Sequence, residues 1–310
     1  IYDEAGSRVR FERGRLEILG VTLPLLPMFS VGTAQGEGYT GFLFPDIRFS
    51  RRLGLEVATP FHVSIAPNRD LTLTPRVYTR SLPGLEASYR EVNRLGAFQL
   101  GGFVSYGDKT DLDETVTNRA IRAYGEAFGR FQFDPHWRLT AHLRAATDKT
   151  VTRRYDITRD DRLRNFLNLE RLDLDSYVSV AGWAFQGLRQ DDIQQQIPIA
   201  LPAIDARWRL ETPGIGGRVE LQANSLAILR RDGQDTQRAF ASARWDHWTL
   251  TPWGQQLQFT ALARGDIYHT DETARTATVL YRGEEGWNAR GIAAAAAEAR
   301  WPFIGSLLGG

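Results

Sequence analysis

Residues 136–145 read HWRLTAHLRA, and apolar and polar side chains alternate at every position of this stretch. Successive side chains of a β-strand point to opposite faces, whereas a helix repeats about every 3.6 residues. One face of the stretch is therefore apolar and the other is polar and basic. The same period of two recurs at 121–133, 204–211 and 218–229. The chain is predicted to be all-β.

The predicted strands are long. Many run for more than ten residues, whereas strands of soluble sheets average about five or six, and a tilted strand crosses the hydrocarbon layer in about 9–11 residues. Length and alternation together predict a transmembrane antiparallel β-barrel, present here in part. About thirteen strands are expected, at 41–50, 53–64, 69–80, 84–92, 96–106, 121–134, 136–148, 176–188, 201–211, 217–230, 238–250, 256–269 and 288–301.

The connections between the strands fall into two classes. Tight turns are expected at 134–135, 251–252 and near 67–68, and long polar loops at 107–120, 149–175 and 270–287. Short turns on one side and long loops on the other are typical of outer-membrane barrels. Asp160 to Leu172 is predicted to be a helix within a long loop, covering the barrel mouth, because its apolar residues lie at helical spacing.

Two domains are expected. Residues 1–38 contain short alternating segments and then a glycine-rich stretch, which indicates the last strands of a soluble β-module and a linker. Residues 39–310 would form the N-terminal part of the barrel. Because the chain opens on Ile1 rather than on Met, we expect a processed or truncated fragment.

Composition excludes several classes of protein. With 24% charged and 42% hydrophobic residues and a mean hydropathy of −0.34, the chain is neither disordered nor a helical membrane protein. The net charge of +1 provides no overall attraction to nucleic acid. Cysteine is absent, which excludes disulfides and thiolate metal sites.

No motif of catalysis stands out. The five histidines lack metal-protease spacing, and no G-x-S-x-G nucleophile motif occurs. We therefore predict no catalytic residues, no metal site, no cofactor and no enzymatic activity.

A resemblance to a known family is concentrated in residues 8–80. The chain resembles the LptD, or organic solvent tolerance, family of lipopolysaccharide-assembly outer-membrane proteins. The matching segments are 10–12, 20–27, GFLFP at 41–45, GLE at 54–56, Pro60-Phe61 and IAPNRDLTLTP at 65–75. The resemblance implies that 1–38 end a periplasmic β-jellyroll and that the remainder is about half of a barrel of roughly 26 strands.

The same resemblance implies a function, a location and partners. The expected function is to insert lipopolysaccharide into the outer leaflet of the bacterial cell outer membrane, with the N-terminal segment in the periplasm. The implied partners are lipopolysaccharide, outer-membrane lipid, an LptE-like lipoprotein plug and a periplasmic LptA-like jellyroll bridge.

Two sets of site residues are predicted. The resemblance places Pro45, Pro60, Phe42 and Phe44 at a lateral gate, where prolines without an N–H would loosen a seam. On the polar faces of the strands, residues predicted to face the lumen, and mostly to pair with one another, are Arg122, Glu126, Arg130, Arg138, Arg144, Arg207, Arg209 and Arg218.

Two other functions remain open at this point. A generic porin or substrate-specific channel would share the alternation, but would give no reason for two prolines in the first strands. A soluble all-β carbohydrate-binding or hydrolytic protein would bury its apolar rows in a dry interior.

Overall fold

The computed structural model describes residues 2–3, 8–12, 15–18, 21–24, 28–32, 40–110, 116–276 and 278–302, with side chains described at 40–108, 119–276 and 278–302. The expected domain boundary at 38–39, most of the glycine-rich linker and the centre of the loop expected at 107–120 lie outside these residues.

Five short strands come first. β1 (Tyr2–Asp3), β2 (Arg8–Glu12) and β5 (Met28–Gly32) form one antiparallel sheet, and β3 (Arg15–Ile18) pairs with β4 (Val21–Pro24). That these strands end a jellyroll stays a prediction.

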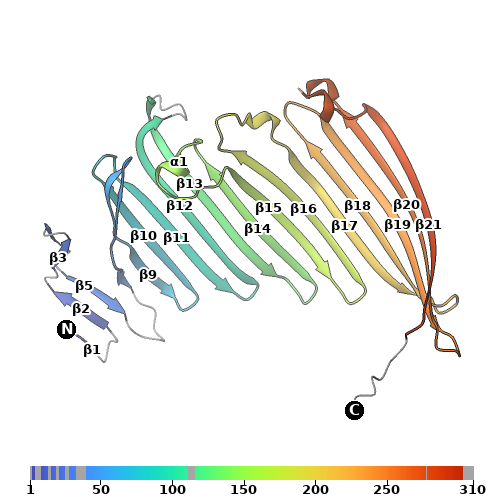
Figure 1. Cartoon of the computed structure of the whole chain (residues 1–310). Coiled ribbons are helices and arrows are strands. Elements are labelled where there is room, and N and C mark those ends of the chain that lie inside the picture. The colour runs from blue at the N-terminus through green and yellow to red at the C-terminus, as the bar shows by residue number, and fades with distance from the viewer. Residues whose placement is uncertain are drawn as a thin grey trace, which may run out of the picture. The chain divides into compact units, whose positions relative to one another are not determined.

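The remaining strands form a sixteen-stranded sheet within the described residues, with β7 and β21 at the two ends of the strand order. From β10 onward, each strand lies beside the next one along the chain (Figure 1). This antiparallel sheet confirms the all-β fold class. Its first eight strands are β6 (Gly41–Phe42), β7 (Asp46–Ser50), β8 (Gly54–Ala58), β9 (Phe61–Ala66), β10 (Arg69–Tyr78), β11 (Gly84–Asn93), β12 (Gly96–Thr110) and β13 (Val116–Gln132).

The second half of the sheet consists of long strands. They are β14 (Trp137–Ala146), β15 (Arg162–Leu172), β16 (Ser176–Gly187), β17 (Ile199–Glu211), β18 (Arg218–Leu229), β19 (Asp235–Leu250), β20 (Gln256–Asp271) and β21 (Gly286–Arg300). In the described part of the chain, the helices are one turn of α-helix, α1 (Val151–Arg154), and the 3-10 turns η1 (Gln194–Gln196), η2 (Thr273–Arg275) and η3 (Val279–Tyr281). Among the described residues, none of these helices is long and apolar enough to cross a bilayer.

The predicted helix at Asp160 to Leu172 is wrong. Residues 162–172 form β15, which lies between β14 and β16 in the sheet. Backbone hydrogen bonds join the two ends of this segment to its neighbours, from Leu172 N to His136 O at 3.0 Å and from Leu188 N to Asp161 O at 2.9 Å. Pairing on both sides satisfies the backbone and so overrides a weak local helical pattern.

The predicted loops change accordingly. The loop expected at 149–175 shrinks to 147–161, which carries α1, and a short turn after β15. The loop expected at 107–120 is largely strand, since β12 runs to Thr110 and β13 starts at Val116. The turns at 134–135 and 251–252 are confirmed as short links between adjacent strands.

The chain divides into two compact units. Unit one comprises 1–131, 140–165 and 185–192, and unit two comprises 132–139, 166–184 and 193–310. The hydrophobic core of unit one gathers where α1 packs on the strands, and consists of Leu53, Tyr78, Phe103, Tyr124, Val151, Tyr155, Leu163 and Leu188.

The opposite face of unit one is apolar and exposed. On this face, Leu85 lies opposite Val104 and Tyr106 lies opposite Ile121 on neighbouring strands, and these four side chains are 41–65% exposed. A soluble sandwich would bury such a row against a second sheet. Large exposed apolar patches instead mark a surface that contacts lipid or protein.

Candidate functional site

Pro45 and Pro60 interrupt two neighbouring strands at one level. β6 pairs with β9 as far as Phe42 opposite Phe61, and pairing resumes between β7 and β8 at Asp46 opposite Ala58. The expected strands 41–50 and 53–64 are therefore each divided in two, and the prolines lie between strands, not inside them as predicted. Proline has no N–H to donate to a ladder, so pairing stops where it occurs.

We call this interruption the proline break (residues 43–45 and 59–60). Across it, the N–H of Leu43 donates to the carbonyl of Pro60 at 2.8 Å, whereas the N–H of Thr59 donates to the carbonyl of Pro75 in the neighbouring strand β10 at 3.1 Å. Three residues on one side face two on the other, which is the mismatch of a β-bulge. The first two strands are thus weakly paired at their middle.

The two predicted gate phenylalanines differ in their surroundings. Phe42 packs edge-to-face on Phe61, with ring centroids 4.9 Å apart, just before the break. Phe44 lies within the break and is 67% exposed. The structure therefore brings Phe42, Phe44, Pro45 and Pro60 together, although their role at a gate stays a prediction.

Most of the arginines predicted to face the lumen are ion-paired. In unit one, Arg122 pairs with Asp148 and Arg144 with Asp160, and the nearest Arg144 nitrogen lies 4.0 Å from a carboxylate oxygen of Glu126. In unit two the pairs are Arg138–Glu170, Arg207–Asp205 and Arg218–Glu211. Arg130 and Arg209 have no ion pair among the residues the structure describes.

A simple sequence signal identifies several of these pairs. Arg207 pairs with Asp205, Arg244 with Asp246 and Arg264 with Asp266. Residues two apart lie on the same face of a strand. The spacing Arg-x-Asp or Asp-x-Arg on an alternating strand therefore predicts an ion pair, and sequence reasoning missed it at 244–246 and 264–266.

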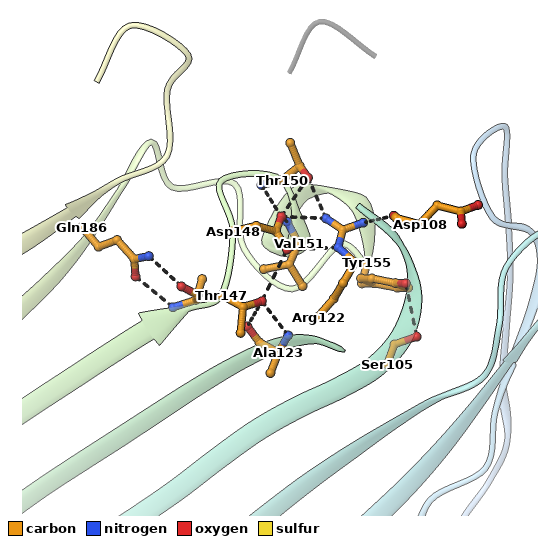
Figure 2. A network of polar contacts seen from close by, with 11 residues as sticks. Ser105, Asp108, Arg122, Ala123, Thr147, Asp148, Thr150, Val151, Tyr155 and Gln186 are labelled. Atoms are coloured by element: carbon orange, nitrogen blue, oxygen red, sulfur yellow. Dashed lines mark hydrogen bonds and ion pairs between the residues drawn. The ribbon is translucent and has the colours of Figure 1, made fainter. Parts of the chain in front are cut away.

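Arg122 behaves differently from a solvated lumen residue, because its side chain is fully buried. Figure 2 shows it directed at Asp148 and Thr150, with Tyr155 beside it. Its Nε and Nη2 donate to the two carboxylate oxygens of Asp148 at 3.1 and 2.8 Å, and Nη2 also donates to Thr150 Oγ1 at 2.6 Å. A two-pronged Arg–carboxylate contact is strong and directional.

Asp148 joins the strands to α1. Besides Arg122, its Oδ1 accepts the backbone N–H groups of Thr150 at 2.9 Å and Val151 at 2.8 Å. Burial acts to raise the pKa of this carboxyl, but the hydrogen bonds from Arg122 and Thr150 outweigh it, so the pKa lies below its ordinary value. Only the tertiary structure brings Arg122 and Asp148 together, since 26 positions separate them.

Around the Arg122–Asp148 pair, side chains also form hydrogen bonds with backbone groups. Gln186 donates to the carbonyl of Ala146 at 2.6 Å and accepts its N–H at 2.9 Å, and Thr147 Oγ1 accepts the N–H of Ala123 at 2.9 Å (Figure 2). The hydroxyl of Tyr155 contacts Ser105 Oγ at 3.2 Å. The segment 147–161 is thereby held on the face of unit one that carries Arg122, opposite the exposed apolar face.

A second charged cluster lies near α1. Asp161 accepts hydrogen bonds from Arg153 and from Arg189, and the Arg189 contact holds the pKa of Asp161 below its usual range. In the described part of the chain, no three histidine, aspartate or glutamate side chains come together as a metal site would need.

Comparison with known proteins identifies relatives. Residues 120–307, more than half of the chain, match the LptD family, described as LPS transport system D. The chain is 38% identical to the LPS-assembly protein LptD of Photobacterium profundum over 95 residues, which is 31% of this chain and 12% of that protein. It is 44% identical to that of Burkholderia ambifaria over 89 residues, 29% of this chain and 11% of the relative. The matched stretches thus cover only a small part of these relatives' length.

Proposed function

Since this chain belongs to the LptD family of lipopolysaccharide transport proteins, we propose that its long strands form part of an outer-membrane β-barrel wall that inserts lipopolysaccharide into the outer leaflet. The observation that carries the proposal is the two-sided sheet of unit one, with exposed apolar side chains on one face and ion-paired arginines on the other. A membrane barrel needs this arrangement, with lipid outside and water inside.

The substrate explains why both faces are needed. The sugars and phosphates of lipopolysaccharide cannot cross hydrocarbon cheaply, and its acyl chains are poorly accommodated in water. Along a charged inner wall the sugars remain hydrated, while the acyl chains leave sideways into the bilayer. Such a path requires a seam in the wall that opens.

We place the seam at the strands that carry the proline break. The break leaves β6 and β7 with little pairing at their middle, and β7 ends the strand order of the described sheet. A weakly paired end strand separates from a closing strand more easily than a fully paired one. Phe42 and Phe44 would then border the opening.

The remaining partners are proposed on family grounds. An LptE-like lipoprotein plug would contact the charged face from the lumen. The strands β1 to β5 would lie in the periplasm as the end of a jellyroll and receive lipopolysaccharide from an LptA-like bridge.

Capture of the substrate in cells tests the proposal. Arg209 on β17 is exposed and has no ion pair among the described residues, whereas the adjacent Trp208 points to the opposite face. A photoreactive amino acid at position 209 of the intact protein should capture lipopolysaccharide, and capture should cease when lipopolysaccharide synthesis is blocked. Capture at position 208 and none at position 209 would show that the sugars do not pass along the charged face, and would contradict the proposal.

A further inference from the structure

Three arginines converge on one buried carboxylate in unit two. The side chain of Asp266 in β20 is fully buried, and Arg264, Arg290 and Arg238 approach it at 2.7, 3.5 and 4.0 Å. The register places Phe240, Asp266 and Arg290 opposite one another on β19, β20 and β21. We call Arg238, Arg264 and Arg290 with Asp266 the arginine triad site.

This site has more positive charge than its carboxylate can balance. Three guanidinium groups face one aspartate, which leaves a local charge of about +2. Arg244 on β19, by contrast, pairs with a single carboxylate: it donates to both oxygens of Asp246 at 2.6 and 2.9 Å, with the same two-residue spacing as Arg264 and Asp266. Simple pairing within a strand therefore does not account for Arg238 and Arg290.

Aromatic rings hold the guanidinium groups in place. Arg264 lies over the ring of Phe240 at 3.8 Å from its centroid, and Arg238 lies over the same ring at 5.5 Å. Arg238 and Arg290 each lie 5.8 Å from the ring centroid of Tyr268, and Arg290 donates to the Tyr268 hydroxyl at 3.0 Å. Cation–π contacts of this kind orient a guanidinium without neutralising it.

Donor groups remain available at the site. Arg238 and Arg290 keep 40% and 56% of their side chains exposed. The Nη2 of Arg238 lies 4.0 Å from Asp266, which is beyond hydrogen-bond distance, and its Nε has no hydrogen-bond partner among the described residues. The exposed guanidinium nitrogens of Arg238 and Arg290 can therefore donate hydrogen bonds to a ligand.

We propose that the arginine triad site binds a phosphate monoester, with Arg238 and Arg290 as its ligands and Arg264–Asp266 as the support that positions them. A dianionic phosphate balances the local excess of positive charge, and its oxygens match the forked donors of arginine. The inference rests on the proposed function in one respect: a phosphorylated sugar of lipopolysaccharide would be the natural source of the group.

Binding of small phosphates to the purified intact protein tests the site. Glucosamine 1-phosphate, inorganic phosphate and unphosphorylated glucosamine would be titrated by calorimetry in detergent at constant ionic strength. We expect the two phosphates to bind and glucosamine not to bind. Tighter binding of the sugar phosphate would identify the lipid headgroup as the source, and equal binding would identify phosphate alone as the recognised group.

Matched variants locate the binding. Arg290→Gln and Arg238→Gln should each lower the affinity for glucosamine 1-phosphate by about tenfold or more, which is the loss expected for one charge-assisted hydrogen bond. The control Arg244→Gln, which removes an arginine from a one-to-one pair on β19, should leave the affinity unchanged. Equal affinity in all three variants, or equal binding of glucosamine, would overturn the proposal.

The outcomes separate this site from the proposed function. Absence of phosphate binding together with lipopolysaccharide capture at Arg209 would reject the site and leave the transport proposal standing. Phosphate binding that depends on Arg238 and Arg290, together with lipopolysaccharide capture at position 208 and none at position 209, would support the site and reject the transport proposal.

Discussion

A fully buried guanidinium depends on its partner more than an exposed one does. The side chains of Arg122 and Asp148 are 0% and 6% exposed, whereas those of Arg218 and Glu211 are 58% and 74% exposed. Asp148→Ala strands a buried charge and should lower the free energy of unfolding by roughly 3–5 kcal/mol. Guanidinium chloride unfolding of the intact protein in lipid vesicles measures this loss.

The matched control for this substitution is Glu211→Ala. It removes a solvated pair and should cost at most about 1 kcal/mol. A similar loss of stability in the two variants would show that Asp148 does not compensate a buried charge.

The same carboxylate makes stability depend on pH. The pKa of Asp148 lies below its ordinary value of 3.8 when the protein is folded, because hydrogen bonds from Arg122 and Thr150 outweigh burial. Its contribution to stability is therefore complete above the ordinary value and is lost as the pH falls through the folded pKa. Unfolding midpoints between about pH 5 and pH 2 should fall less steeply in Asp148→Asn than in the unsubstituted protein. Parallel curves would contradict this assignment.

At the scale of the element, the proline break is the feature with a consequence for transport. A residue with an N–H at 45 or 60 can extend the ladder between β6–β7 and β8–β9, which now stops at Phe42 and restarts at Asp46. Pro45→Val and Pro60→Val should therefore tighten the seam and slow the appearance of lipopolysaccharide at the cell surface, measured by pulse labelling and surface capture.

Pro252, in the turn between β19 and β20, provides the control. Pro252→Val changes a turn and not a strand, so delivery should remain at the unsubstituted rate. If Pro45→Val and Pro60→Val both deliver lipopolysaccharide at the unsubstituted rate, the proposal of a seam at the proline break is contradicted.

At the scale of the whole molecule, the proposal requires that one face of the sheet contacts water and the other contacts lipid. His142 and Leu143 are adjacent in β14 and point to opposite faces at the same depth, and the chain has no cysteine. In the membrane-inserted protein, Cys substituted for His142 should react with a charged maleimide, and Cys substituted for Leu143 only with a lipid-soluble one. Reaction of both with the charged reagent would exclude a lipid-facing apolar row.

Much of the architecture follows from local sequence. Alternation with a period of two defines a face for every side chain without any knowledge of its neighbours, and strand positions such as 136–148 and 256–269 were therefore predicted to within two residues. Family residues at 41–45 and 65–75 indicated the lipopolysaccharide-transport family that the comparisons then showed. Ion pairs at i and i+2, such as Arg207 with Asp205, are local in the same sense.

Other features arise only from pairing between distant segments. β15 is a strand because neighbours on both sides satisfy its backbone, and its own side chains had favoured a helix. The proline break becomes visible only when the register places Phe42 opposite Phe61 and Asp46 opposite Ala58. Arg122 with Asp148, and Arg238 and Arg290 around Asp266, meet across strands. The order of amino acids is enough to predict the face on which each strand residue lies, because backbone geometry alternates the faces. Which residues meet on that face depends on the register of separate strands, and register is a property of the folded sheet.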